Sequence, residues 1–342
     1  MPSRPFSIAL LGATGAAGRA VLEVLEDRDV PLSEVKLLAT ARSAGQEIDF
    51  RGEPHKVQAV APGAFRGCDL ALLCAGAEAS RAWAPVARAE GALVVDDSAA
   101  FRDEAGVPSV VPEVNPEALD LAAGGLVANP GSLAIALALV LKPLQAAAGL
   151  TQAVCVTYQC VSGAGLRGVE QLEREASDLM NGREPQPPTR IRHRIAFNLV
   201  PQVGEVGADG VSAEEAGLAR ETRRLLGLPG LPMSATAVRV PVFYGHAAAL
   251  HLGLARPLAV EEARAALRAA PSVKVLDQPG EGIYPMPMLA VNDDSVLVGR
   301  LRADAALPNG LALFLSIDNL RKGGATNLVQ LAELLAARRP VA

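Results

Sequence analysis

A glycine-rich segment near the start of the chain has the residue types and spacing to bind a cofactor phosphate. The apolar stretch Phe6–Leu11 predicts a β-strand and runs into a G-x-x-G-x-x-G sequence, which the helical pattern Ala16–Leu25 follows. The segment consists of Gly12, Ala13, Thr14, Gly15, Ala16, Ala17 and Gly18. Glycines permit a tight turn close to a pyrophosphate, and the helix start offers free N–H groups. A plain turn is the alternative, but the flanking strand and helix favour a dinucleotide site.

The end of the second predicted strand indicates which dinucleotide would bind. Val35–Ala39 is followed by Thr40-Ala41-Arg42-Ser43, which contains no carboxylate to hold the ribose hydroxyls of NAD. Arg42 and Ser43 can instead contact a 2′-phosphate, although an exposed loop arginine is the alternative interpretation. We therefore predict NADP as the cofactor.

Length and composition are those of a two-domain globular protein. The chain has 342 residues, of which 20% are charged. Its net charge of -5 does not indicate binding to nucleic acid or to an anionic membrane. None of the cysteines Cys68, Cys74, Cys155 and Cys160 forms a C-x-x-C pair, so no zinc site is expected. The sequence shows no secretory signal, which predicts a cytoplasmic protein.

The predicted elements indicate an α/β fold. Strands alternate with helical patterns in the first part of the chain, as in a Rossmann-type parallel sheet; the strands are Phe6–Leu11, Val35–Ala39, Leu70–Cys74, Leu93–Asp96 and Leu126–Ala128. The uncharged stretch Leu121–Leu141 is interrupted by Asn129-Pro130-Gly131, so we expect no membrane span.

After Asn129 the pattern predicts a second, mixed α/β domain. A helix is expected over Ser132–Ala148, with a kink or break at Pro143. Further helices are expected over Val169–Asn181, Ala213–Leu226 and Val260–Ala270, and strands over Val154–Tyr158, Val238–Val242, Ala249–Leu254, Ser295–Arg300 and Leu311–Ile317. We predict a dinucleotide-binding domain of residues 1–131, completed by a carboxyl-terminal helix within 319–342, and a second domain of residues 132–318.

Several longer motifs resemble those of the aspartate-semialdehyde dehydrogenase family. The most specific are Ser162-Gly163-Ala164-Gly165, Arg239-Val240-Pro241-Val242 and Asp318-Asn319-Leu320-Arg321-Lys322-Gly323. The sister family of N-acetyl-glutamyl-phosphate reductases shares the glycine loop, and Asn129-Pro130-Gly131 is similar to its version, but the later motifs fit the semialdehyde enzymes. The resemblance implies a homodimer built through the second domain, which binds the substrate.

The resemblance also implies roles for individual residues. Gln159 matches the family's glutamine that positions the reacting carbonyl, and His246 matches its acid–base histidine. The substrate-binding positions correspond to Arg102 (phosphate), Glu214 (the substrate amino group) and Arg239 (the substrate carboxylate). Gly163 and Asn327 fall at cofactor-binding positions.

The chain departs from the family pattern around the reacting centre. Ser132 stands where the family has its nucleophilic cysteine, whose thiolate would form at a helix amino terminus. Gly131 and Gly217 replace an asparagine and a lysine that bind phosphate. Other departures in this neighbourhood are Leu133, Ala134 and Ala248. The combination resembles the Usg-type paralogues, which also lack the cysteine.

Three functions remain open on these residues. A serine hydroxyl needs a general base, which His246 could supply, but an acyl-serine ester is a poor donor to phosphate. The favoured interpretation is a dehydrogenase homologue with weak or no activity; the alternatives are an NADP-binding regulatory or scaffold protein and an acyl hydrolase that uses Ser132 and His246. We also expect Arg102 and Arg239 to face a common cleft that takes a small anionic ligand.

Overall fold

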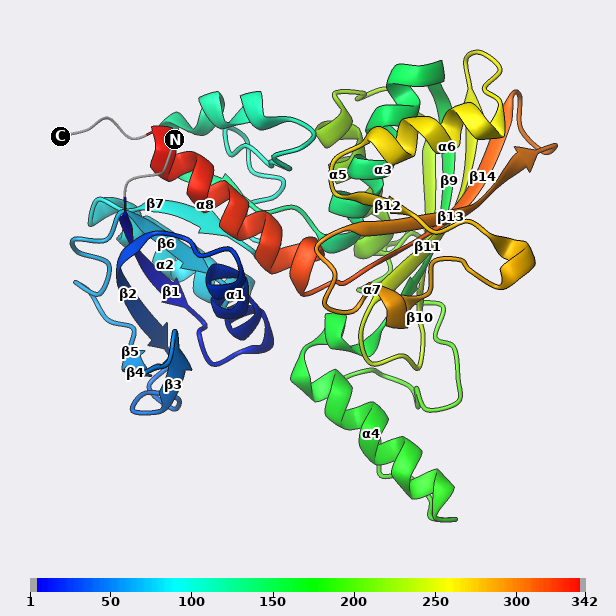
Figure 1. Ribbon diagram of the computed structural model, residues 1–342. Helices are drawn as coiled ribbons and strands as arrows, with labels where there is room; N and C mark the ends of the chain where they lie inside the picture. The colour runs from blue at the N-terminus through cyan, green and yellow to red at the C-terminus, as the bar shows by residue number, and fades with distance from the viewer. Residues whose placement is uncertain (1–4, 339–342) are drawn as a thin grey trace. The chain divides into compact units, whose positions relative to one another are not determined.

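A computed structural model describes residues 5–338, and the chain folds as two compact units (Figure 1). Met1–Gly131 and Gly323–Ala342 form the first unit, and Ser132–Lys322 form the second. The chain therefore leaves the first unit after Gly131 and returns to it for its last helix.

The first unit is built on a parallel sheet with the strand order β5-β2-β1-β6-β7-β8. The strands are β1 (Phe6–Leu11), β2 (Leu32–Ala39), β5 (Gln58–Ala59), β6 (Leu70–Leu73), β7 (Leu93–Asp96) and β8 (Leu126–Ala128). All six residues of β1 and all four of β6 are buried, as expected for strands covered on both faces. The Rossmann-type fold predicted from the alternating pattern is confirmed.

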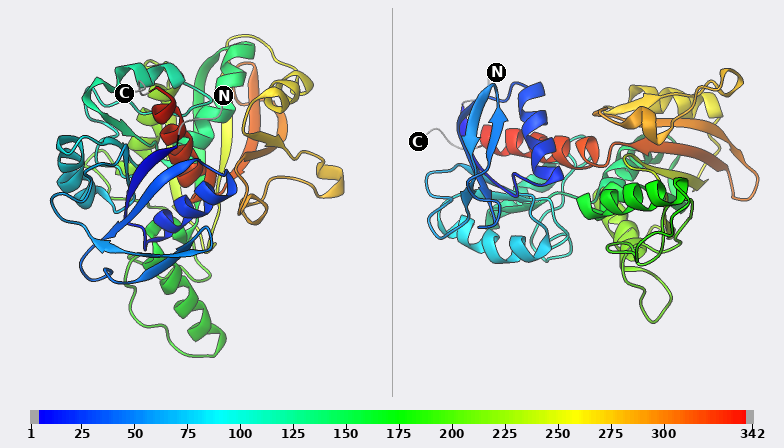
Figure 2. Two further views of the ribbon diagram at one scale, coloured as in Figure 1. Left: turned by 60° about the vertical axis from the view of Figure 1, so that its left-hand side comes forward. Right: turned by 90° about the horizontal axis from the view of Figure 1, so that it is seen from below.

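Helices cover both faces of this sheet. The crossovers from β1 to β2 and from β6 to β7 run in opposite directions along the sheet, so right-handed connections place α1 (Ala16–Asp27) and α2 (Ala77–Ala89) on opposite faces. The last helix, α8 (Thr326–Arg338), packs against α1 and against β6 and β7 (Figure 2). The strand order reverses between β1 and β6, the point where α/β sheets bind ligands at the carboxyl ends of their strands.

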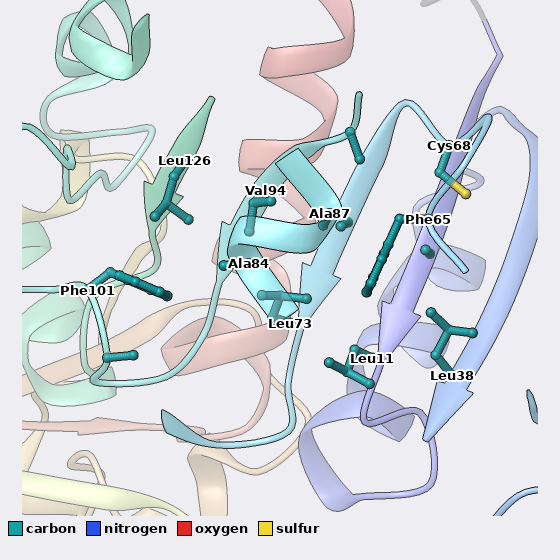
Figure 3. Close-up of a cluster of buried hydrophobic side chains, with 14 of the residues drawn as sticks. Leu11, Leu38, Phe65, Cys68, Leu73, Ala84, Ala87, Val94, Phe101 and Leu126 are labelled. Carbon is teal, nitrogen blue, oxygen red and sulfur yellow. The ribbon is translucent and has the colours of Figure 1, made fainter. Parts of the chain in front are cut away.

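A continuous apolar core lies between the sheet and α2. Figure 3 shows side chains of this cluster, among them Leu11 and Leu73 of the sheet, Ala84 and Ala87 of the helix, and the ring of Phe65. Phe65 and Ala87 are completely buried. This packing fixes the carboxyl end of β1, where the glycine segment begins, and that of its neighbour β6.

Smaller elements of the first unit were not predicted from the sequence. A hairpin of β3 (Glu47–Phe50) and β4 (Glu53–Lys56) follows the second strand, and the 3-10 helix η1 (Pro116–Gly124) precedes β8. The hairpin strands are short and largely polar, so they lack the apolar alternation that marks a strand.

The second unit contains a mixed sheet with the order β10-β9-β11-β14-β13-β12. Strands β9, β10 and β14 run in one direction and β11 runs against them. The strands are β9 (Leu150–Gln159), β10 (Met233–Arg239), β11 (His246–Leu254), β12 (Val273–Val275), β13 (Val296–Asp304) and β14 (Gly310–Ile317). The predicted strand Val238–Val242 is wrong in its bounds: β10 ends at Arg239, because Pro241 has no N–H to continue the ladder.

The remaining elements of the second unit are helices and turns. The α-helices are α3 (Ser132–Ala148), α4 (Leu166–Met180), α5 (Ala213–Leu226), α6 (Val260–Ala269) and the short α7 (Pro287–Ala290). Single turns are formed by η2 (Val161–Ala164), η3 (Pro279–Glu281) and the π-helical η4 (Arg321–Ala325), which leads into α8.

The expected break of the first of these helices at Pro143 does not occur. Helix α3 continues through Pro143 to Ala148, and its apolar residues from Leu133 to Leu141 are buried on all sides. A proline inside a helix costs about 3 kcal/mol, whereas each buried leucine contributes about 1.5–3 kcal/mol, so the burial of the helix outweighs the proline. None of the described helices is long and apolar enough to cross a bilayer.

Candidate functional site

The glycine segment forms a tight loop that a side chain would fill. Gly12 has φ +93°, and a Cβ there would lie 2.6 Å from the carbonyl oxygen of Cys74. A Cβ on Gly18 would lie 2.2 Å from the oxygen of Gly12. Helix α1 begins after Gly15 with no capping side chain on its first N–H groups. The loop and helix start therefore fit a pyrophosphate group.

The position predicted to select the 2′-phosphate lies in a turn directly after β2. Arg42 is exposed and Ser43 is half-buried. A guanidinium in this position can reach a phosphate bound at the end of β2.

A second group of polar residues occupies the carboxyl ends of β7 and β8. Arg102 donates Nε to the carbonyl of Asn129 at 2.9 Å and Nη2 to the carbonyl of Asp97, also at 2.9 Å. Asn129 donates Nδ2 to Oδ1 of Asp97 at 2.7 Å. Burial raises the pKa of Asp97 to about 6, although the hydrogen bond from Asn129 and the charge of Arg102 act to lower it.

Asn327, in the first turn of α8, supplies an unpaired acceptor in the same unit. Its side chain is fully buried, and its Nδ2 donates to the carbonyl of Val110 at 3.0 Å and to Oδ1 of Asn129 at 2.7 Å. Among the described residues, nothing donates a hydrogen bond to its Oδ1. A buried acceptor without a donor is costly, so this atom fits a ligand N–H group such as the carboxamide of a nicotinamide.

In the second unit, the sheet topology brings the predicted ligand-binding residues to one edge. Arg239 ends β10 beside Gln159, which ends the parallel strand β9. His246 begins the antiparallel strand β11 at the same edge, opposite Ile317 at the end of β14. All three predicted side chains are at most 7% exposed.

Gln159 is oriented by two acceptors. Its Nε2 lies 3.0 Å from Oε1 of Glu214, at the start of α5, and 3.3 Å from Oγ1 of Thr157. The structure thus joins Gln159 to Glu214, two residues that we predicted to contact one ligand. With both amide hydrogens used, Gln159 presents Oε1 as an acceptor.

Arg239 and His246 are held by the segment that follows β9. Arg239 donates Nη1 to the carbonyl of Cys160 at 2.6 Å, and the backbone N–H of Cys160 donates to Nδ1 of His246 at 3.2 Å. Burial, assisted by the charge of Arg239, lowers the pKa of His246 to about 3. Burial also lowers the pKa of Arg239, against the charge of Glu214.

Sequence analysis did not identify Cys160 and Asn319 as part of this cluster. The sulfur of Cys160 lies 3.1 Å from Nδ1 of His246 and 3.1 Å from Oδ1 of Asn319. Asn319 follows the end of β14 and also accepts the N–H of Gly245 at 3.1 Å. The sequence signals that could have identified them are the position of Cys160 directly after Gln159 and that of Asn319 within the Asp318–Gly323 motif.

Ser132 is the first residue of α3 and is half-buried. Within residues 5–338, it forms no hydrogen bond with His246. Gly217 lies inside α5, while Leu133, Ala134 and Ala248 are buried. Gly163 is in the turn η2 beside His246, so the structure places it with the second unit's cluster, and Arg102 with the first unit's.

Comparison with known proteins identifies both units. A family model described as semialdehyde dehydrogenase, NAD binding domain, matches residues 7–122, and one described as semialdehyde dehydrogenase, dimerisation domain, matches residues 141–322. The chain belongs to the aspartate-semialdehyde dehydrogenase family. The family predicted from the motifs is thus confirmed, and the first unit is a nicotinamide-dinucleotide-binding domain.

Relatives in this family match the chain over nearly its whole length. The aspartate-semialdehyde dehydrogenase of Aquifex aeolicus is 41% identical over 96% of this chain and 98% of its own, and that of Synechocystis is 43% identical over 99% of both. A crystal structure of aspartate semialdehyde dehydrogenase II from Vibrio cholerae, complexed with ASA, is 38% identical and superposes with a TM-score of 0.95 over 99% of this chain and 100% of that one.

Proposed function

We propose that this family member binds NADP and a small anionic ligand and has weak or no dehydrogenase activity. The observation that carries this proposal is Ser132 at the amino terminus of α3, where the family resemblance calls for a cysteine. A thiol has a pKa near 8.5 and forms a reactive thiolate at a helix start, whereas a serine hydroxyl needs a strong base. The Usg-type paralogues are the relatives that this pattern resembles.

His246 is a poor base for activating Ser132. His246, the predicted acid–base residue, has a pKa lowered to about 3, and its Nδ1 already accepts the N–H of Cys160. No carboxylate among the described residues hydrogen-bonds to its ring. These observations also disfavour a serine hydrolase that would use Ser132 and His246.

The cofactor proposal rests on the first unit. Arg42 and Ser43 follow β2 without a nearby carboxylate, which favours NADP over NAD. A crystal structure of aspartate semialdehyde dehydrogenase with NADP from Candida albicans is 26% identical and superposes with a TM-score of 0.76 over 98% of this chain. Bound NADP would supply hydride acceptance; the glycine loop and Asn327 would hold its pyrophosphate and carboxamide.

The ligand proposal rests on the second unit. Arg239 is a buried cation whose guanidinium hydrogen-bonds only to Cys160 among residues 5–338, so its other N–H groups can hold a carboxylate through a bidentate contact. Glu214 and Gln159 supply acceptors for an ammonium or hydroxyl group of the same ligand. We also propose that Arg102 retains its affinity for an anion.

Two measurements on one protein sample test the function. We expect calorimetry to show NADP binding and a spectrophotometric assay to show little NADP reduction with aspartate semialdehyde and phosphate. Ser132→Cys should restore part of the activity, and adding Gly131→Asn and Gly217→Lys should restore more; Ser132→Ala is the matched control and should equal the unmodified chain. Turnover at about 1–1,000 per second by the unmodified chain would refute the loss of activity.

A regulatory or scaffold role is the form of this proposal that involves no turnover at all. Such a role predicts that the chain binds NADP but shows no activity in the dehydrogenase assay or in an ester-cleavage assay. Ester cleavage that disappears in Ser132→Ala would instead establish the hydrolase.

We further propose that the chain is a homodimer assembled through the second unit. The domain description supports it, as does a sheet face on which Val154 is 40% exposed while its neighbours Ala153 and Cys155 are buried on the opposite face. Analytical ultracentrifugation should give a dimer that Val154→Asp weakens, with Thr151→Asp, also exposed on β9, as the charge-matched control. A monomeric unmodified chain would contradict the proposal.

A further inference from the structure

We propose that His246 acts as a hydrogen-bond donor through its Nε2–H, and that the backbone N–H of Cys160 holds the imidazole in this tautomer. The inference deepens the proposed function, because it concerns the same ligand site in the second unit. It assigns His246 a role different from the acid–base role that the family resemblance implies.

The tautomer follows from the direction of one hydrogen bond. The backbone nitrogen of Cys160 lies 3.2 Å from Nδ1 of His246, and a backbone N–H can only donate. Nδ1 must therefore carry the lone pair, and the proton of a neutral ring must lie on Nε2. The sulfur of Cys160 also lies 3.1 Å from Nδ1, but its single thiol hydrogen is donated to Oδ1 of Asn319.

The donor that fixes the ring is itself held on both sides. The carbonyl of Cys160 accepts Nη1 of Arg239 at 2.6 Å, and the N–H of Val161 donates to the carbonyl of Val242 at 2.8 Å. Asn319 links the sulfur of Cys160 to the N–H of Gly245, the residue before His246, at 3.1 Å each. Cys160 and Asn319 are thus positioning residues for the imidazole.

Nε2 of His246 borders a space that is open because residue 163 is a glycine. A Cβ on Gly163 would lie 3.1 Å from Nε2 of His246 and 3.0 Å from Nη1 of Arg239. His246 is 4% exposed, and no residue in the described range 5–338 hydrogen-bonds to Nε2. An N–H that borders an open space beside a guanidinium can donate to an oxygen atom of a ligand.

The chemistry of that oxygen follows from its two partners. Arg239 and His246 both donate and neither accepts in this arrangement, so the atom between them must accept two hydrogen bonds, as a carboxylate or carbonyl oxygen does. A neutral imidazole contributes a directional hydrogen bond without adding a second buried charge beside Arg239.

Nitrogen-15 NMR tests the tautomer directly. The chain has four histidines, so a [15N]histidine-labelled sample gives few signals. We expect His246, assigned with His246→Gln, to show the Nε2–H pattern from pH 5 to 8 without titrating. An Nδ1–H pattern, or a titration near pH 6.5, would overturn the proposal.

Cys160→Ala separates the backbone donor from the thiol. Alanine keeps the N–H, so we expect the Nε2–H pattern to remain. A switch to Nδ1–H in this variant would show that the thiol sets the tautomer and would refute the assignment to the backbone. These readouts involve neither NADP nor turnover, so their outcome is independent of the proposed loss of activity.

Titration with succinate, a small dicarboxylate, tests the donor role. We expect it to shift the Nε2–H signal of His246 in the unmodified chain and to lose at least tenfold in affinity in Gly163→Ala, whose methyl group would fill the space. Gly230→Ala is the control, because a Cβ there meets nothing within 4 Å. Succinate binding that leaves the His246 signal unmoved would contradict the donor role.

Discussion

Asn327 donates its Nδ2 hydrogen to Oδ1 of Asn129 at 2.7 Å, although the two residues are 198 positions apart in the sequence. Asn129 in turn donates to Asp97 at 2.7 Å. An ionised carboxylate can only accept, so Asp97 sets the orientation of the Asn129 amide, and Asn129 sets that of Asn327. The chain of bonds ends at the unpaired Oδ1 of Asn327, which therefore presents an acceptor.

We predict that Asp97→Asn raises the free energy of unfolding at pH 8 by about 1 kcal/mol. Each unit of the pKa difference between the folded and unfolded chain corresponds to about 1.4 kcal/mol, but solvent reduces the total because Asp97 is partly exposed. The folded pKa of about 6 exceeds the unfolded value near 3.8, so the ionised carboxyl group is unfavourable in the folded chain above pH 6. This cost decreases as the pH falls from 6 to about 4. Urea unfolding should therefore show a gain at pH 8 and none at pH 4, with the exposed Asp49→Asn unchanged at both; a gain independent of pH would contradict this.

Two glycines of the dinucleotide loop should differ in what they affect. A Cβ on Gly18 would lie 2.2 Å from the oxygen of Gly12, so Gly18→Ala should lower the free energy of unfolding by about 1–3 kcal/mol through overpacking. A Cβ on Gly15 meets that oxygen at 3.4 Å, so Gly15→Ala should fold normally and weaken NADP binding by crowding the pyrophosphate. Thermal unfolding and calorimetry separate the two effects. Equal loss of stability in both variants would disprove the distinction.

Replacement of Arg42 by alanine should reduce the preference for NADP over NAD. A hydrogen bond to a charged group is worth about 1.5–3 kcal/mol, and solvent at this exposed position lowers it to about 1.4 kcal/mol, or tenfold in Kd. NAD affinity should not change, nor should either affinity in Arg81→Ala, another exposed arginine of the first unit. If the unmodified chain bound NAD more tightly than NADP, the proposal that NADP is the cofactor would be contradicted.

Helix α5 offers a stability test at a position where the resemblance calls for lysine. Gly217 lies in the helix interior, and a Cβ there would meet the side chains of Arg220 and Glu221 only at 3.9 Å. Gly217→Ala should therefore stabilise the chain by about 0.5–1 kcal/mol. Gly227→Ala, at the end of the same helix with φ +68°, should destabilise it. Chemical denaturation measures both, and a loss in Gly217→Ala would show that the site has no room for a side chain.

The sequence predicts the parallel sheet well, because its strands are buried on both faces. Phe6–Leu11, Leu93–Asp96 and Leu126–Ala128 agree with the strands of the structure to the residue. The second sheet is less predictable: β10 begins with Met233-Ser234-Ala235, whose small and polar residues carry little strand signal. The break predicted at Pro143 was wrong, because the local effect of proline can be read from the sequence whereas the burial around α3 cannot.

Some residues of the candidate site could likewise be predicted from the sequence, and others could not. The family resemblance selects Gln159, Arg239 and His246, and the structure brings them to one edge of the sheet. The contribution of Cys160 depends on strand register: β9 must end where β11 begins for its N–H to reach the histidine. Sequence spacing does not reveal which atom of the ring accepts a hydrogen bond, so the tautomer could not be predicted.

The return of the chain to its first unit determines the order in which the two units can be completed during synthesis. Ser132–Lys322 is continuous, so the whole second unit has been made before any of α8 leaves the ribosome. Asn129 then still lacks its partner Asn327, and Arg28 lacks Glu333, its ion-pair partner at 2.6 Å. A chain that ended at residue 322 and had left the ribosome would carry all of the second unit and a first unit in which the surface of β6 and β7 covered by α8 is exposed.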